Sequence, residues 1–334
     1  MNPFKVGIIG TGWIAERMAE TLSGMEGVEK YSIASRTKEK AESFAMQWGF
    51  SCSYGSYEDL ANDSDIDLVY IATPHSLHYD NVKMCLLAGR NVLCEKAFTA
   101  NARQAEEIIA LAHERNIFLT EAIWTRYQPF RKTISELIGS GIIGNVHQLS
   151  ANLCYPNIDR PRMYLPELAG GVLLDLGVYA LNFAAMCFGT DYKIVSSSCQ
   201  LTDTGVDAAN SMALHWEDGR MGVLWSSNLV RSDRQGVISG DRGHIIIENI
   251  NNPQSATVVD NDYKMIKIVK CPPQITGYEY QVYESINCIR RGDIESSFMP
   301  HAETIRIMKE MDNLRKEWGV IYPWDYRNLE KLRF

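Results

Sequence analysis

The chain has 334 residues, of which 46% are hydrophobic and 22% charged, and its formal net charge is −8. This length exceeds what one ordinary hydrophobic core organises, so we expect two domains. The acidic balance, without a basic block, argues against a nucleic-acid partner, and no apolar run has the length that predicts a membrane span.

The first third of the chain alternates apolar, strand-like runs with segments of helical spacing. Strands are expected over residues 4–9, 31–34, 68–72, 91–94 and 118–121. Helices are expected between them, over residues 13–23, 38–48, 57–61, 77–88 and 102–115. This alternation predicts a parallel sheet with right-handed crossovers, so residues 1–122 are expected to form a doubly wound α/β domain.

Beyond residue 122 the pattern changes. A long helical stretch over residues 171–188 precedes strand-like segments at 194–201, 211–216, 221–229, 235–239, 244–248, 256–260 and 264–269. Two helices near 278–290 and 302–317 follow them. Successive strands without helices predict a large, mainly antiparallel sheet, so residues 123–334 are expected to form an α+β domain for substrate binding and dimerisation. An open apolar face on such a sheet would need a partner, which predicts a homodimer.

The eight cysteines are scattered, and none forms a Cys-x-x-Cys pair. We therefore expect free thiols in a reducing compartment, with neither a disulfide framework nor a metal site. The first five residues lead directly into a predicted strand, which leaves no room for a signal peptide. These features predict a cytoplasmic protein.

The first predicted strand ends in a Gly-x-Gly-x-x-Ala turn that closes at Ala15. In this pattern the first glycine permits a tight turn and the second lets the backbone approach a pyrophosphate, which the amides of the helix N-terminus favour. The turn therefore predicts a dinucleotide-binding Rossmann domain. Its cofactor contacts are expected from Gly10, Thr11, Gly12, Trp13 and Ile14.

The second predicted strand is followed by Ser35, Arg36, Thr37 and Lys38. NAD-binding domains carry an acidic residue near this place, which binds the adenosine ribose. No acid stands here. Arg36 can instead bind a 2′-phosphate, with Ser35 and Lys38 as further donors, so the sequence favours NADP over NAD. The alternative is a solvated arginine at a helix start.

Further segments follow in the order of a known family. They are Thr73-Pro74-His75-Ser76-Leu77-His78, Cys94-Glu95-Lys96, the stretch 121–127 with Trp124 and Arg126, and Gly170-Gly171 before Asp175 and Tyr179. With the glycine turn, they resemble the Gfo/Idh/MocA oxidoreductases, and most closely the dimeric dihydrodiol dehydrogenase and NADP-dependent xylose dehydrogenase branch. The resemblance is strong to about residue 189 and looser beyond, and it is not specific to one substrate.

The resemblance implies that Lys96 is catalytic and that Glu95 helps to hold the site, because Glu95-Lys96-Ala97 matches the family's Glu-Lys-Pro signature. An ammonium at the carboxyl end of a strand can hydrogen-bond a substrate hydroxyl and stabilise developing oxyanion charge. Ala97 departs from the family proline, so a cis peptide bond is not predicted there. An ordinary surface lysine is the alternative.

Asp175 and Tyr179 lie four residues apart in a predicted helix and share one face of it. The resemblance implies that Tyr179 is the acid–base group. Its phenol titrates too high for this work unless a cation such as Lys96 favours the phenolate. Asp175 could orient the substrate or tune the lysine. The alternative is a core tyrosine and a helix-face aspartate.

The resemblance also implies that Thr73 and Pro74 line the cofactor, that Trp124 walls the substrate, and that Arg126 touches the cofactor or an acid. His78 fits a cofactor contact and a packing residue equally well. A buried tryptophan beside a paired arginine explains Trp124 and Arg126 nearly as well.

The polar, proline-rich segment 155–164 is expected to be a loop and is a candidate to cover the substrate. We assign no role to its Arg160 and Arg162.

These observations together predict an NADP-preferring dehydrogenase or reductase. It would transfer a hydride between nicotinamide and a carbinol or carbonyl carbon of a sugar, polyol or cyclic diol. Two alternatives stay open: an NAD-dependent glycoside hydrolase that oxidises its substrate transiently, and a non-catalytic dinucleotide-binding regulatory protein.

Overall fold

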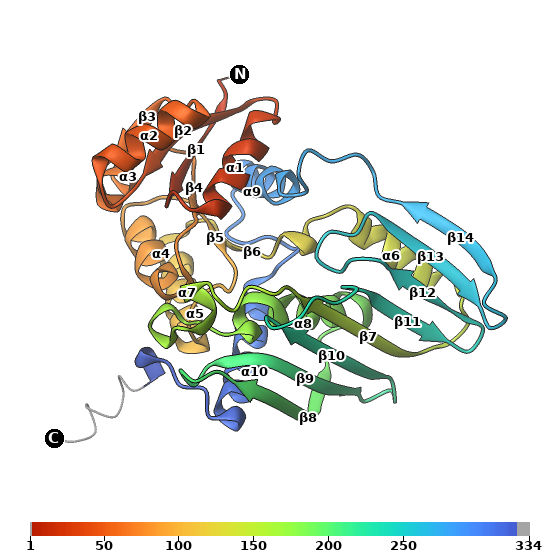
Figure 1. The fold of residues 1–334 in the computed structure, drawn as a ribbon. Coiled ribbons are helices and arrows are strands. Elements are labelled where there is room, and N and C mark those ends of the chain that lie inside the picture. The colour runs from red at the N-terminus through yellow and green to blue at the C-terminus, as the bar shows by residue number, and fades with distance from the viewer. Residues whose placement is uncertain (1, 326–334) are drawn as a thin grey trace. The chain divides into compact units, whose positions relative to one another are not determined.

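The computed structural model describes residues 2–325, and these fall into two compact units (Figure 1). Of these residues, the first unit contains 2–127 together with Gln274–Met308, and the second contains Gln128–Pro273 and 309–325. The units are thus not contiguous in sequence, unlike the predicted domains 1–122 and 123–334. The reason is α9 (Glu279–Arg291), whose Val282 and Ile286 are buried in the core of the first unit.

The first unit is built on a six-stranded sheet in the order β3-β2-β1-β4-β5-β6, with every neighbouring pair parallel. The strands are β1 (Phe4–Ile9), β2 (Val28–Ala34), β3 (Cys52–Tyr54), β4 (Leu68–Ile71), β5 (Val92–Glu95) and β6 (Leu119–Ala122). The expected doubly wound Rossmann sheet is confirmed. The short edge strand β3 was not predicted, because three half-buried residues carry no apolar run.

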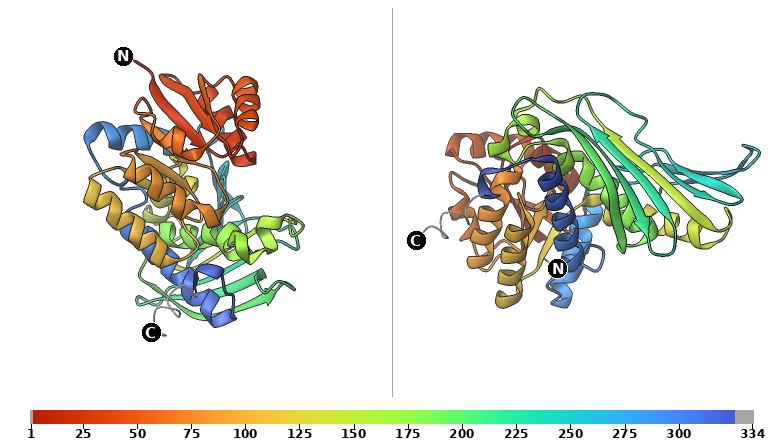
Figure 2. Two further views of the ribbon diagram at one scale, coloured as in Figure 1. Left: turned by 90° about the vertical axis from the view of Figure 1, so that its left-hand side faces the viewer. Right: turned by 90° about the horizontal axis from the view of Figure 1, so that it is seen from below.

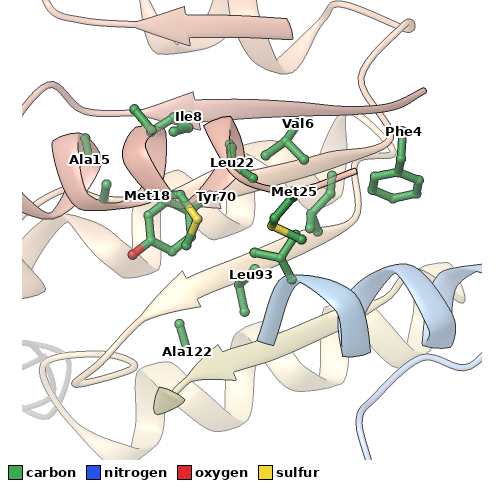
Figure 3. Packing of buried hydrophobic residues seen from close by; sticks show 14 of the residues in the cluster. Phe4, Val6, Ile8, Ala15, Met18, Leu22, Met25, Tyr70, Leu93 and Ala122 are labelled. Atoms are coloured by element: carbon green, nitrogen blue, oxygen red, sulfur yellow. The ribbon is translucent and has the colours of Figure 1, made fainter. Parts of the chain in front are cut away.

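The helices between these strands are α1 (Trp13–Ser23), α2 (Lys38–Trp48), α3 (Tyr57–Ala61), α4 (His78–Leu87) and α5 (Ala102–Arg115). In α1 the helical spacing of Ala15, Met18 and Leu22 places all three against the sheet. There they meet Ile8 of β1 and Tyr70 of β4 in one apolar cluster (Figure 3). This packing holds the start of α1 directly beyond the end of β1.

The second unit contains an eight-stranded sheet in the order β14-β13-β12-β11-β7-β10-β9-β8. The strands are β7 (Val146–Cys154), β8 (Tyr192–Leu201), β9 (Asp207–Trp216), β10 (Met221–Ser227), β11 (Gly236–Gly240), β12 (Gly243–Ile247), β13 (Ser255–Asp260) and β14 (Met265–Lys270). Neighbours are antiparallel except β7 and β10, which are parallel. The expected mainly antiparallel sheet is confirmed, although its central strand β7 was not predicted.

Helices cover one face of this sheet. The helix α8 (Val178–Phe188) packs on β7 and β10, and α6 (Phe130–Gly139), another element that was not predicted, packs on α8 (Figure 2). The last long helix, α10 (His301–Trp318), continues into this unit, where the Trp318 indole donates to Ser197 Oγ on β8 at 2.9 Å.

The helical stretch expected over 171–188 is confirmed from residue 172 onward, with a π-helical turn, Leu173–Gly177, that leads into α8. The stretch Pro166–Phe188 is long and apolar enough to span a membrane by length and composition, with mean hydropathy 1.7. This corrects the expectation that no run reaches that length. However, 89% of its apolar window is buried inside the protein, as in the core helix of a folded domain.

Candidate active site

The two glycines of the turn after β1 have different surroundings. Gly10 has a φ of +107°, and a Cβ built on it would lie 2.8 Å from the Ala72 carbonyl oxygen, so only glycine fits. Gly12 is the N-cap of α1 with an extended backbone, and a Cβ built there would meet nothing within 4 Å. The open space lies where the amides at the start of α1 are unpaired by the helix itself. A pyrophosphate fits this turn by its chemistry.

The residues after β2 are arranged around this turn. Ser35 is buried, with its Oγ 3.4 Å from Thr11 Oγ1. Arg36 is exposed, as a group that receives a phosphate from solvent must be. The Lys38 ammonium donates to the Ser53 carbonyl at 2.5 Å. Arg36 is therefore the more available cation for a 2′-phosphate.

The loop after β5 carries Lys96 and is held by buried groups. The Glu95 carboxylate accepts a hydrogen bond from the Tyr70 hydroxyl through one oxygen and from the Lys96 amide, at 3.2 Å, through the other. The Lys96–Ala97 peptide bond is cis although residue 97 is not proline, which differs from the sequence expectation. Lys96 itself is only partly buried.

His78 is completely buried at the start of α4, and both of its ring nitrogens face main-chain carbonyls. Nδ1 lies 2.8 Å from the Ala97 oxygen and Nε2 lies 2.8 Å from the Thr73 oxygen. Burial lowers the pKa of the imidazole. This position favours a structural role, in which the ring links the Thr73 segment to the Lys96 loop.

These segments share one edge of the sheet. Because β1, β4 and β5 are parallel neighbours, their carboxyl ends lie at the same edge, and the strand order reverses at β1 and β4. Ligands of open α/β sheets bind outside that edge, at the reversal. The glycine turn, Thr73 and the Lys96 loop therefore lie where a cofactor is expected.

Trp124 and Arg126 are both buried in the first unit. The Trp124 ring stacks on Tyr278 with centroids 4.1 Å apart and an interplanar angle of 2°. Arg126 Nη1 lies 2.7 Å from Glu303 Oε2. The structure thus shows a packed tryptophan and a paired arginine. Sequence reasoning missed both partners, because they lie far along the chain, Tyr278 at the N-cap of α9 and Glu303 in α10.

The second unit presents Asp175 and Tyr179 on the helical segment around α8, both buried. Arg162 Nη1 lies 2.5 Å from Asp175 Oδ1. Arg162 was given no role from sequence, and its segment is not entirely a loop: α7 (Pro161–Tyr164) is a short helix opened by a proline. The pairing supplies a positive charge for a carboxylate that is 5% exposed.

The start of this segment depends on Asp207, which sequence analysis did not single out. Its Oδ2 accepts hydrogen bonds from the Leu173 amide at 2.8 Å and from Asn210 at 2.9 Å. Gly171 has a φ of +114°, and a Cβ there would lie 2.3 Å from Asp207 Oδ1. Burial raises the pKa of the Asp207 carboxyl to about 6 despite these hydrogen bonds.

All eight cysteines are free thiols, and within residues 2–325 no group of three or more His, Cys, Asp or Glu side chains is placed to hold a metal ion. Burial raises the pKa of Cys85 to about 12 and that of Cys94 above its ordinary value. These two thiols therefore stay protonated and unreactive near neutral pH.

Comparison with known proteins identifies the family. Residues 4–122 match the model of the oxidoreductase family with an NAD-binding Rossmann fold, and residues 132–246 match that of the Gfo/Idh/MocA C-terminal domain. The chain belongs to the Gfo/Idh/MocA family. The expectation of an NAD(P)-dependent dehydrogenase or reductase that acts on CH–OH groups is thereby confirmed.

Curated relatives match nearly the whole chain. A trans-1,2-dihydrobenzene-1,2-diol dehydrogenase of Xenopus tropicalis is 34% identical, over 96% of this chain and 99% of its own. The D-xylose 1-dehydrogenase (NADP(+)) of Hypocrea jecorina is also 34% identical, over 96% and 94%. Among solved structures, a 3-ketoreductase from Actinomadura kijaniata in complex with NADP has a TM-score of 0.86 at 24% identity, over 94% of this chain and 98% of its own, which shows a shared fold.

Proposed function

We propose that this protein is an NADP-preferring dehydrogenase or reductase of a sugar, polyol or cyclic diol, with Lys96 and Tyr179 as its catalytic residues. The observation that carries the proposal is the shared sheet edge, where β1 ends at the glycine turn with its open space at Gly12 and β5, two strands along, ends at the Lys96 loop held by Glu95. The substrate class is that of the relatives, which are named for a dihydrodiol, xylose and scyllo-inositol.

The nicotinamide cofactor, when bound, accepts or supplies the hydride. The residues of this chain bind it, orient the substrate and move the proton. In the proposal, the Lys96 ammonium donates a hydrogen bond to the substrate oxygen and stabilises negative charge as it develops there. The Tyr179 hydroxyl takes or returns the proton of that oxygen. Asp175, held by Arg162, orients the substrate hydroxyls.

The cofactor preference rests on Arg36. It stands where an NAD-specific domain would carry an acid, and its guanidinium is exposed at the end of β2. In the same proposal, Ser35 and Thr11 form the wall beside the adenosine ribose. The eight free thiols suit a reducing compartment, so we place the protein in the cytoplasm.

The test is turnover with a panel of polyols, diols and aldoses, followed by Lys96→Met and Tyr179→Phe. Each should lower kcat by about 100-fold or more, because general acid–base groups contribute about 10²–10⁴. Lys132→Met and Tyr263→Phe, whose side chains are exposed, are matched controls and should leave kcat unchanged. Full turnover by Lys96→Met would remove the lysine from the mechanism. Sugar release without net change in nicotinamide would point to the hydrolase instead.

The uncovered face of the eight-stranded sheet supports a homodimer. The strand register places one residue of each strand in a single row, and none of the eight is charged: Ser196, Ala213, Val223, Ser150, Val237, Ile246, Thr257 and Ile268. Val223 is 54% exposed and Ile268 49%. An uncharged, partly apolar row across this face suits a second copy of the same face, since a two-fold axis pairs like with like.

Sedimentation velocity tests the homodimer. The protein should sediment as a dimer, and Val223→Asp should sediment as a monomer because it buries two unpaired carboxylates at the interface. Met46→Asp, at an 84% exposed site on α2, should remain dimeric. A monomeric wild type would contradict the proposal, and so would a dimeric Val223→Asp.

A further inference from the structure

The main chain of the Lys96 loop is fixed residue by residue. Glu95 accepts the Lys96 amide hydrogen, and His78 lies within hydrogen-bond distance of the Ala97 carbonyl. The next amide, that of Phe98, donates to the carboxylate of Glu121. Glu121 is the penultimate residue of β6, belongs to the same unit as the loop and has no part in the mechanism proposed above.

Glu121 approaches the loop from the other face of the sheet. In the register of β5 and β6, Glu121 pairs with Cys94, whereas Glu95 pairs with Ala122. Successive side chains of a strand point to opposite faces, so the two glutamates lie on opposite faces. Tyr70, the partner of Glu95, pairs with Leu93 and therefore lies on the face of Glu95.

Glu121 is 3% exposed, and its carboxylate accepts a second hydrogen bond from Thr304 Oγ1 of α10, at 3.1 Å. The ionisable groups that interact with it electrostatically are Cys94 on its own face of β5, Glu95 across the sheet, and Arg126 and Tyr127 from the segment after β6. Arg126 favours the charged carboxylate, and Glu95 opposes it. A carboxylate buried in this way does not reach solvent, so its role is to fix the neighbouring groups that donate hydrogen bonds to it.

We propose that Glu121 is a positioning residue for Lys96, whose carboxylate fixes the loop through the Phe98 amide while Glu95 fixes it from the opposite face. The two carboxylates together leave the Lys96 main chain one conformation, from which the ammonium points to the reacting oxygen. This inference rests on the proposed catalytic role of Lys96.

The burial of Glu121 separates this role from a stabilising one. Burial raises the pKa of its carboxyl to about 7, so the charged form that holds the loop best is costly for the folded state. Glu121→Gln removes that charge and keeps an oxygen for the Phe98 amide. At pH 8 we expect this variant to be at least as heat-stable as the wild type, whereas a residue kept for stability would lower Tm when replaced.

The experiment compares Glu121→Gln with Glu114→Gln, an exposed glutamate of α5, as the matched control. Hydrogen exchange of the peptide over residues 96–100 should become about fivefold or more faster in Glu121→Gln, because a neutral acceptor holds an amide less strongly. At pH 8, kcat of Glu121→Gln should be about tenfold below that of the wild type, because small misplacements of catalytic groups cost this much or more. The NADPH dissociation constant of the variant should stay within about twofold of the wild-type value. We expect wild-type kcat to fall below about pH 7, as Glu121 gains a proton, and this fall should be absent in the variant.

Unchanged exchange in the loop would overturn the inference, and so would faster exchange with unchanged kcat and pH profile. If Glu121→Gln does not fold, Thr304→Val serves as the second variant, because it removes one hydrogen bond from the same carboxylate. It should show smaller changes of the same kind, and no change in loop exchange or kcat in Thr304→Val would also overturn the inference. Lys96→Met distinguishes failure of this inference from failure of the proposed function. If that variant turns over normally, the proposed function fails, while the exchange measurement still decides whether Glu121 holds the loop.

Discussion

Replacing the two glycines of the turn after β1 one at a time separates the folding role of this turn from its binding role. In Gly10→Ala, the new Cβ would lie 2.8 Å from the Ala72 carbonyl oxygen at a φ of +107°. Backbone strain of this kind costs about 1–3 kcal/mol, and a forced contact in a packed site costs about 1–3 kcal/mol more. The variant should therefore lose about 2–6 kcal/mol of unfolding free energy, a large share of a domain's stability.

In Gly12→Ala, the new Cβ meets nothing within 4 Å and the backbone is already extended. The folded protein should lose at most about 1 kcal/mol, the usual cost of a poorer N-cap. The methyl group would, however, occupy the space for a pyrophosphate. Loss of one charge-assisted hydrogen bond, about 1.5–3 kcal/mol, would raise the NADPH dissociation constant about tenfold to 100-fold.

Urea denaturation of the cofactor-free variants and fluorescence titration with NADPH measure the two effects separately. We expect Gly10→Ala to shift the denaturation midpoint and Gly12→Ala to shift the binding curve. A Gly12→Ala protein that binds NADPH like the wild type would show that the pyrophosphate does not lie at this turn. A Gly10→Ala protein of normal stability would refute the steric argument.

Two further predictions concern single side chains. Arg36→Ala should raise the dissociation constant of NADPH about tenfold or more, the worth of a charge-assisted contact to phosphate, and leave that of NADH within about twofold; equal losses for both cofactors would contradict the role of Arg36. Burial raises the pKa of Asp207 from 3.8 to about 6. Between these two values the folded state keeps a proton that the unfolded state releases. The free energy of unfolding should therefore fall by up to about 3 kcal/mol as pH rises from about 4 to 6. Urea denaturation across this pH range should show that the wild type loses more unfolding free energy than Asp207→Asn does. If the unfolding free energies of the two proteins changed in parallel with pH, Asp207 would not carry a buried proton.

Sequence patterns predicted most strands and helices of the first unit, because each of these elements is marked by a pattern within its own residues. Apolar runs marked five of its six strands, and helical spacing marked α1 over residues 13–23. The exception, β3, is an edge strand of three half-buried residues. In the second unit, β7 was not predicted because its first residues, Val146, His147 and Gln148, are not buried and break the apolar run.

The candidate site was predictable where one chain segment carries the pattern, as in the glycine turn and around Lys96. It was not predictable where the partner lies far along the chain. Arg162 meets Asp175 and Glu303 meets Arg126 only after folding. The same holds for Asp207, whose contact with the Leu173 amide is a tertiary contact that leaves no local trace in the sequence.

Transfer of a labelled hydride tests the central claim most directly. The protein is incubated with NADP⁺ and a polyol or diol that carries deuterium on its carbinol carbon, and the nicotinamide product is examined by mass spectrometry. We expect deuterium on the nicotinamide ring in stoichiometric amount with the ketone formed, and labelling about 100-fold or more slower with Lys96→Met. Product that forms while the deuterium stays out of the nicotinamide would contradict hydride transfer by this protein.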